Sequence, residues 1–180
     1  MQVTNFFDSI RLDGAFGFKI TDVRRNPETA RSRLIPVNEG TPTFRNFSFS
    51  GLTVGKAAGL AVIEGLPERF MSGVTLQDIT LVRGTAGIFC SLAADVSIGS
   101  VTVPTLEGPA VDAREVQRLE IHRLRCSHPR RDVPLVWMEN VADAFVHGCD
   151  VGDPGPGYSW LRQEQSRNVV LSDNRIPPAR

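Results

Sequence analysis

Hydrophobic residues recur along the chain in a sparse pattern, at relative positions 0, 2, 5 and 7 of a repeat. Six such runs begin 27, 22, 23, 25 and 25 residues apart, and Asn174 alone breaks the pattern. This spacing is too irregular for a heptad and shorter than most paired-helix repeats, so it predicts one turn of a β-solenoid for each run. The runs are Phe47/Phe49/Leu52/Val54, Val74/Leu76/Ile79/Leu81, Val96/Ile98/Val101/Val103, Leu119/Ile121/Leu124/Cys126, Ala144/Val146/Cys149/Val151 and Val169/Leu171/Asn174/Ile176.

The local period of each run favours strands over helices. Two inward residues separated by one outward residue, then a break and two more, are typical of two short half-buried strands. A helix would instead require apolar residues three and four positions apart. The break carries mostly polar or conformationally permissive residues, so each coil is expected to turn a corner there. These residues are Gly51, Asp78, Ser100, Arg123, Gly148 and Asp173.

A third strand is expected eight residues before each run. Leu60–Ile63 takes this place in an early coil, where it is displaced by the insertion Gly65–Glu68. The sequence therefore predicts an all-β chain, a parallel β-helix of about six to seven coils with three short strands each, in one domain covering residues 1–180. The inward candidates of this third strand are Ile88/Cys90, Val111/Ala113, Val136/Met138 and Leu161/Gln163.

Composition supports a turn-rich β domain and excludes several other classes. The 180 residues are 41% hydrophobic but only 7% aromatic, with 16 glycines and 12 prolines. Twenty acidic and twenty basic side chains cancel, so a nucleic-acid partner is not expected. No apolar stretch approaches the ~20 residues of a membrane span, and Met1–Phe7 lacks the pattern of a secretion signal.

Three segments resemble a known family. Gly40–Thr53, Ile63–Glu68 and Val74–Leu81 look like the C-terminal part of polygalacturonase-like glycoside hydrolases of family 28, and Met1–Leu12 resembles the coil after their active site. The resemblance is best from residue 1 to 103. It implies a right-handed parallel β-helix, inverting cleavage of pectin-type polysaccharides, no cofactor, and a secreted or periplasmic parent enzyme.

The family's catalytic motifs are missing from the sequence. They are an Asn-Thr-Asp segment, an Asp-Asp pair, a Gly-His-Gly segment and an Arg-Ile-Lys segment, and the Asp-Asp strand reads Ala57–Leu60 or Thr85–Ile88 here. Inverting hydrolysis requires two carboxyl groups. We therefore expect a truncated C-terminal piece of a longer enzyme, inactive alone and open to self-association through strand edges. A non-catalytic carbohydrate-binding solenoid or a purely structural one is the alternative.

A new catalytic pair on the outward face of the third strand is a further hypothesis. Parity places Asp112, Glu139 and Glu164 there, and strand geometry puts the backbones of the first two ~8 Å apart, within the range of an inverting pair. Trp137 on the same face could supply a platform for a sugar ring, and packing beneath a loop is the alternative for this side chain. The alternative is a surface ladder in which Arg114 and Arg162 pair with these acids.

Two loops and a tail lie outside the repeat: residues 16–41, 152–159 and 177–180. The first contains four arginines, whose guanidinium groups could bind an acidic sugar carboxylate if this loop borders a cleft as in the resembling enzymes. An ordinary solvated loop is the other reading, since glutamates dilute the positive charge. The arginines are Arg24, Arg25, Arg31 and Arg33.

The histidines and cysteines predict no metal site and no disulfide. His122 and His147 occupy the same outward position in consecutive coils, but two ligands make a poor zinc site, so we expect solvated histidines. His128 has no evident partner. The three cysteines fall at different places in their coils and are expected to be small core residues. They are Cys90, Cys126 and Cys149.

Overall fold

The computed structural model describes residues 9–11, 18–21, 36–39, 41–152 and 158–176. Within these ranges every regular element is a strand. No helix in this part of the chain is long and apolar enough to cross a membrane. The strands are β1 (Ser9–Arg11), β2 (Phe18–Thr21), β3 (Arg45–Val54), β4 (Ala57–Glu64), β5 (Met71–Leu81), β6 (Gly84–Val103), β7 (Val111–His122), β8 (Arg125–Cys126), β9 (Val136–Glu139), β10 (Ala142–His147), β11 (Asp150–Val151), β12 (Leu161–Glu164) and β13 (Arg167–Ser172).

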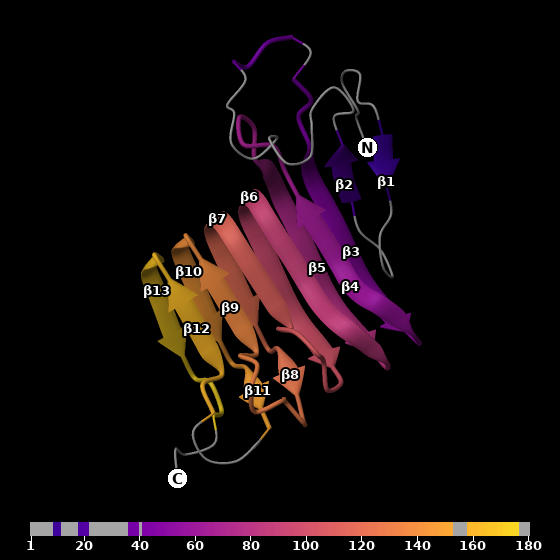
Figure 1. Cartoon of the computed structure of the whole chain (residues 1–180), viewed down its shortest axis with the longest axis vertical. Coiled ribbons are helices and arrows are strands. Elements are labelled where there is room, and N and C mark those ends of the chain that lie inside the picture. Colours follow the sequence, from indigo (N-terminus) through magenta and orange to yellow (C-terminus); the bar gives the residue numbers. More distant parts are fainter. Residues whose placement is uncertain (1–8, 12–17, 22–35, 40, 153–157, 177–180) are drawn as a thin grey trace.

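The strands stack in parallel as a β-solenoid of about five turns, which confirms the predicted fold class (Figure 1). Each predicted inward column is in register from coil to coil. Val74, Val96 and Leu119 are successive partners, and the column continues through β10 and β13. The third-strand column runs from Ile88 through β7 and β9 to Leu161.

The first strands depart from the expected coil at Met1–Leu12. β1 pairs antiparallel with β2, and β2 then pairs parallel with β4. The connection between β1 and β2 is short, and short connections join antiparallel neighbours, whereas a parallel pair requires a longer crossover. The described part of the chain has about five turns instead of the expected six to seven, and it begins with this antiparallel pair. It also places a strand, β2, inside the expected loop 16–41.

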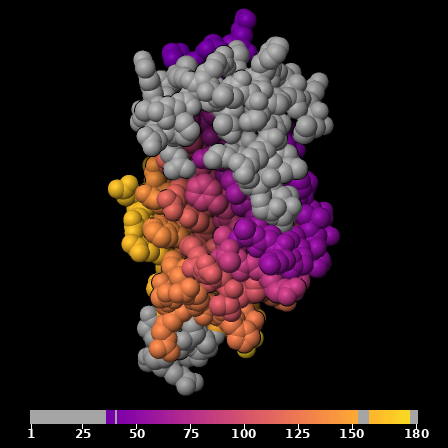
Figure 2. Space-filling view, turned by 45° about the vertical axis from the view of Figure 1, so that its right-hand side comes forward, coloured from indigo at the N-terminus to yellow at the C-terminus, as the bar shows by residue number. Residues whose placement is uncertain are grey.

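The hydrophobic core is a continuous stack inside the coils. Ile79, Ile98 and Val101 are fully buried, and Ile79 is the register partner of Val101 in the next coil. Burying such a side chain stabilises the fold by roughly 1.5–3 kcal/mol, so each coil depends on the coils beside it. Figure 2 shows the coils as successive bands across the surface, from purple through pink to orange and yellow.

Each coil turns its corners with residues in the left-handed backbone region. All six residues at the predicted break have φ between 50° and 66°, including Asp78, Arg123 and Gly148. Two more corner columns were not predicted. One directly precedes each run, and the other lies four residues before four of the runs. Their members are Asn46, Gly73, Asp95, Arg118, Asp143 and Asn168 for the first column, and Leu92, Glu115, Asn140 and Gln165 for the second.

Side chains cross-link two pairs of neighbouring coils at the corner that precedes the runs. The guanidinium of Arg118 donates to both carboxylate oxygens of Asp95, at 2.5 and 2.9 Å. Two coils further along the stack, the Asn168 amide donates to Asp143 at 2.8 Å. A left-handed conformation costs an L-residue roughly 1–2 kcal/mol, so these contacts lie where the backbone is least favourable.

Candidate functional site

The outward side chains of the third strand line up as the sequence predicted. Phe89, Asp112, Trp137 and Arg162 are in register across four coils, and Ser91, Arg114, Glu139 and Glu164 form the adjacent column. We call these eight residues the third-strand face. They come from β6, β7, β9 and β12, which present equivalent positions because the coils share one register.

The acids predicted as a catalytic pair are in contact with arginine. Arg114 donates from Nε and Nη2 to the two carboxylate oxygens of Asp112, both at 2.9 Å, and its Nε lies 3.9 Å from Glu139. The hydrogen bond to Asp112 raises the pKa of Arg114. Glu164 accepts from Arg162 at 2.9 Å. An inverting pair requires one acid to hold a proton and the other to activate water, and neither role suits a carboxylate bound bidentately by a guanidinium.

Trp137 does not present an open ring to solvent. The guanidinium of Arg114, from the coil before, lies 5.5 Å from the ring centroid, and that of Arg162, from the coil after, lies 4.9 Å from it. Arg114 is also 5.7 Å from the centroid of Phe89. These are cation–π distances. The face is therefore a ladder of alternating aromatic and guanidinium groups, with carboxylates along its side.

A second outward cluster lies on β7 and β10. His147 Nε2 is 3.2 Å from Glu120 Oε1, and the other Glu120 oxygen accepts from Ser97 at 3.2 Å. The rings of His122 and His147 stack with centroids 5.5 Å apart, and Phe145 stacks on His147 at 4.3 Å. Sequence reasoning missed Glu120, although parity places it outward, two residues before His122.

The histidine cluster has the electrostatics of a partly desolvated surface site. The hydrogen bond from His147 is the largest cause that lowers the pKa of Glu120. Desolvation by burial lowers the pKa of His122, against the opposing effect of Glu120. The two imidazole planes lie within 14° of parallel, so their nitrogen lone pairs do not converge on one point. No group of three or more potential metal ligands occurs in the part of the chain that the structure describes.

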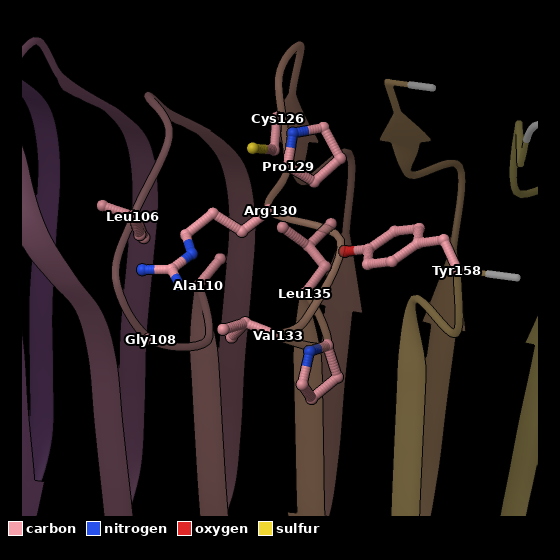
Figure 3. A pocket seen from close by; sticks show the side chains of 10 residues that line it. Leu106, Gly108, Ala110, Cys126, Pro129, Arg130, Val133, Leu135 and Tyr158 are labelled. Atoms are coloured by element: carbon pink, nitrogen blue, oxygen red, sulfur yellow. The ribbon is translucent and has the colours of Figure 1, made fainter. Parts of the chain in front are cut away.

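A small pocket lies between the loops that follow β6, β8 and β11 (Figure 3). It has room for about one water molecule. The Tyr158 ring enters it with the hydroxyl directed toward Leu135, and that hydroxyl is buried without a hydrogen-bond partner. Desolvation raises the pKa of Tyr158 to about 12. The volume excludes a sugar and suits a bridging water.

The remaining predicted residues have these positions. Arg24, Arg25, Arg31 and Arg33 lie outside the described residues, as do residues 177–180 and most of the 152–159 segment. His128 does have a partner, since its Nδ1 lies 3.0 Å from the Ser127 hydroxyl. The partner is the adjacent residue in the sequence. Comparing equivalent positions between coils does not reveal such a contact. The three cysteines are free and buried in the core, and burial raises the pKa of Cys90 to about 12.

Comparison with known proteins adds a structural likeness. No family model matches the sequence, and neither does any curated protein. Among solved structures, the chain is similar to one described as a putative glycosyl hydrolase from Parabacteroides merdae ATCC 43184. The two share 12% sequence identity with a TM-score of 0.45, over 76% of this chain and 78% of that one.

Proposed function

We propose that this chain is a carbohydrate-binding β-solenoid related to the polygalacturonase-like glycoside hydrolases, and that it binds a pectin-type polysaccharide without cleaving it. The ligand lies along the third-strand face, parallel to the axis of the stack. One observation carries the proposal: aromatic and charged hydrogen-bonding groups repeat in register across four coils. A polymer with repeating sugars can meet such a ladder at several successive positions, which increases its effective affinity.

The chemistry of the face suits sugars. Arg162 and Glu139 keep about half of their side-chain surface exposed, whereas Asp112 is 18% exposed. Guanidinium groups donate hydrogen bonds and carboxylates accept them, so a sugar hydroxyl can make both kinds of contact on this face. The edges of Phe89 and Trp137 add apolar contact between these polar groups.

The absence of an unpaired acid on this face argues for binding without hydrolysis. Asp112 and Glu164 each accept hydrogen bonds from an arginine, and Glu139 lies close to Arg114. In such pairs the guanidinium hydrogen bonds occupy the carboxylate oxygens that would have to reach a substrate. A general acid for glycoside cleavage must instead be protonated at the working pH, which requires a raised pKa.

The charge of the face selects among pectin-type polymers. Its three carboxylates and two guanidinium groups sum to a formal charge of −1. Because an anionic polymer would be repelled by this excess, we expect esterified, uncharged stretches of the polysaccharide to bind better than de-esterified polygalacturonate.

Affinity electrophoresis tests the proposal with both polymers in the gel. Esterified pectin should retard the native chain, polygalacturonate should retard it less, and Trp137→Ala together with Arg162→Ala should abolish the retardation. Phe145→Ala is the matched control, since Phe145 is an exposed aromatic on a different face. No retardation of the native chain by either polymer would favour a purely structural solenoid instead. If Phe145→Ala reduces the retardation as much as the double substitution does, the third-strand face is not the binding site.

A further inference from the structure

The last coil that the structure describes has one strand edge for which no neighbouring strand is described. Within the described residues β13 pairs only with β10, and β12 only with β9. Apolar side chains of β13 are unusually open to solvent: Val170 is 56% exposed and Leu171 is 46% exposed. An unpaired strand edge flanked by exposed apolar residues is a template for pairing with another strand.

Only alternate residues of β13 direct their backbone N–H and C=O groups toward that edge. The Ser172 carbonyl accepts a hydrogen bond from Gly148 N–H at 3.1 Å, so the Ser172 peptide faces back toward the preceding coil. Because successive residues of a strand direct their N–H and C=O groups to opposite sides, Val169 and Leu171 direct theirs toward the unpaired edge.

We propose that this edge is a dimer interface, in which β13 pairs antiparallel with β13 of a second copy of the chain across a two-fold axis at Val170. This register places Val169 opposite Leu171 of the second copy, so the groups at the edge form the closely spaced hydrogen-bonded pairs of an antiparallel ladder. The two copies of Val170 then face each other at the axis, where exposed apolar surface is buried.

The charges at the two ends of β13 support the same register. Asp173 lies one residue beyond β13 at a left-handed corner, and pairing about Val170 brings it to the same end of the interface as Arg167 of the second copy, twice because the interface is symmetric. Opposite charges facing one another across strands stabilise pairing, and like charges destabilise it. The edge is therefore self-complementary in charge as well as in hydrogen bonding.

The polar residues of the last coil argue against an open-ended stack of copies. Gln163 and Asn174 occupy inward positions that hold Met138 and Cys149 in the preceding coil. A head-to-tail continuation in the same register would place Leu52 of the next copy over the amide of Asn174. A two-fold contact instead closes on itself, and it uses this edge once.

Sedimentation equilibrium of the full chain over a wide concentration range tests the proposal. The native chain should show a monomer–dimer equilibrium with no larger species. Val170→Asp should raise the dissociation constant by about tenfold or more, because two carboxylates then meet at the axis. Val82→Asp is the matched control, since Val82 is 51% exposed away from this edge, and its dissociation constant should equal that of the native chain.

A set of charge-reversal variants tests the register of the two β13 strands. Arg167→Asp and Asp173→Arg should each weaken the dimer, and the double variant should restore it, because each pair then has opposite charges again. Circular dichroism and thermal unfolding confirm that each variant folds. A native chain that stays monomeric, grows beyond two copies, or responds equally to Val170→Asp and Val82→Asp would overturn the proposal. A double variant that dimerises no more tightly than the single variants would also overturn it.

Discussion

The side-chain oxygen of Asn174 accepts a hydrogen bond from the backbone N–H of Cys149 at 3.0 Å. The amide nitrogen of the same side chain donates to the carbonyl of Val146 at 2.9 Å. Asn174 is the one residue that breaks the apolar pattern, and these two bonds show its role. It satisfies two backbone groups of the preceding coil at this corner.

Asn174→Leu should therefore destabilise the chain, although leucine restores the apolar pattern. We expect a loss of about 1–3 kcal/mol in the free energy of unfolding, because one donor and one acceptor of the backbone lose their partner. Urea unfolding measures the change. Asn174→Asp keeps the acceptor and loses the donor, so it should cost less than Asn174→Leu at neutral pH. A leucine variant as stable as the native chain would contradict this role.

Gly148 should be sensitive to substitution because of its backbone conformation alone. Its φ is +62°, and a Cβ there would meet only Arg123 Cγ at 3.7 Å, an ordinary contact. Gly148→Ala should cost about 1 kcal/mol from the left-handed strain. Gly55→Ala is the control, because a Cβ at Gly55 meets nothing within 4 Å and the backbone is not left-handed. Equal effects of the two substitutions in thermal unfolding would refute the assigned corner conformation.

Gly99 makes room for the side chain of His122. A Cβ at this position would lie 2.2 Å from His122 Nε2 and 2.2 Å from Gln77 Oε1. Both obstacles are ends of flexible side chains, so Gly99→Ala should move the imidazole outward and leave the fold intact. Since desolvation lowers the pKa of His122, the displaced ring should titrate at a higher pH, closer to its ordinary value. An NMR titration that finds the pKa unchanged would argue against this packing.

Stability should decrease as the pH falls through the histidine range. The pKa of His122 is lowered in the folded chain from the usual 6.5, so the unfolded chain binds more protons just below that value. The free energy of unfolding should therefore fall as the pH drops below about 6.5 toward the folded-state pKa. His122→Gln should flatten this part of the profile. A native profile that is flat, or that rises on acidification, would contradict the sign.

A second loss of stability is expected at lower pH from Glu120. Its pKa is lowered chiefly by the hydrogen bond to His147, so its contribution is present above the ordinary glutamate pKa and disappears as the pH falls through the lowered value. Glu120→Gln should remove this step below pH 4.5, the ordinary value, and leave the histidine step in place. If both steps persist in the glutamine variant, another carboxylate is responsible.

The fold could be predicted from the sequence because the same spacing of apolar residues recurs from coil to coil. An inward residue at every second position, such as Val96 and Ile98, defines a strand, and the recurrence of the run aligns Val96 with Leu119. The corner at Ser100 was predictable because the pattern breaks there. The corner at Arg118 was not, because arginine has no turn preference and its left-handed backbone is accompanied by a contact with Asp95 from another coil.

The sequence predicted which residues share the third-strand face, but it left open which of them are in contact. Parity placed Asp112 and Glu139 on one face and left two alternatives open, a catalytic pair or pairing with arginine, and only the structure shows that Arg114 binds Asp112 and approaches Glu139. That arrangement depends on side-chain rotamers and on a neighbour from another coil. The Glu120–His147 contact was missed for the same reason, since the two residues are 27 apart in sequence.

Reducing-end release from esterified pectin, measured on samples in which binding is also recorded, tests the central claim most directly. The account predicts that the chain is retained by the polysaccharide while reducing ends stay at the level of a heat-denatured control, at every pH where the chain is folded. Asp112→Asn should leave that level unchanged. Reducing ends that accumulate with the native chain and vanish with Asp112→Asn would contradict the account and make the third-strand face a catalytic site.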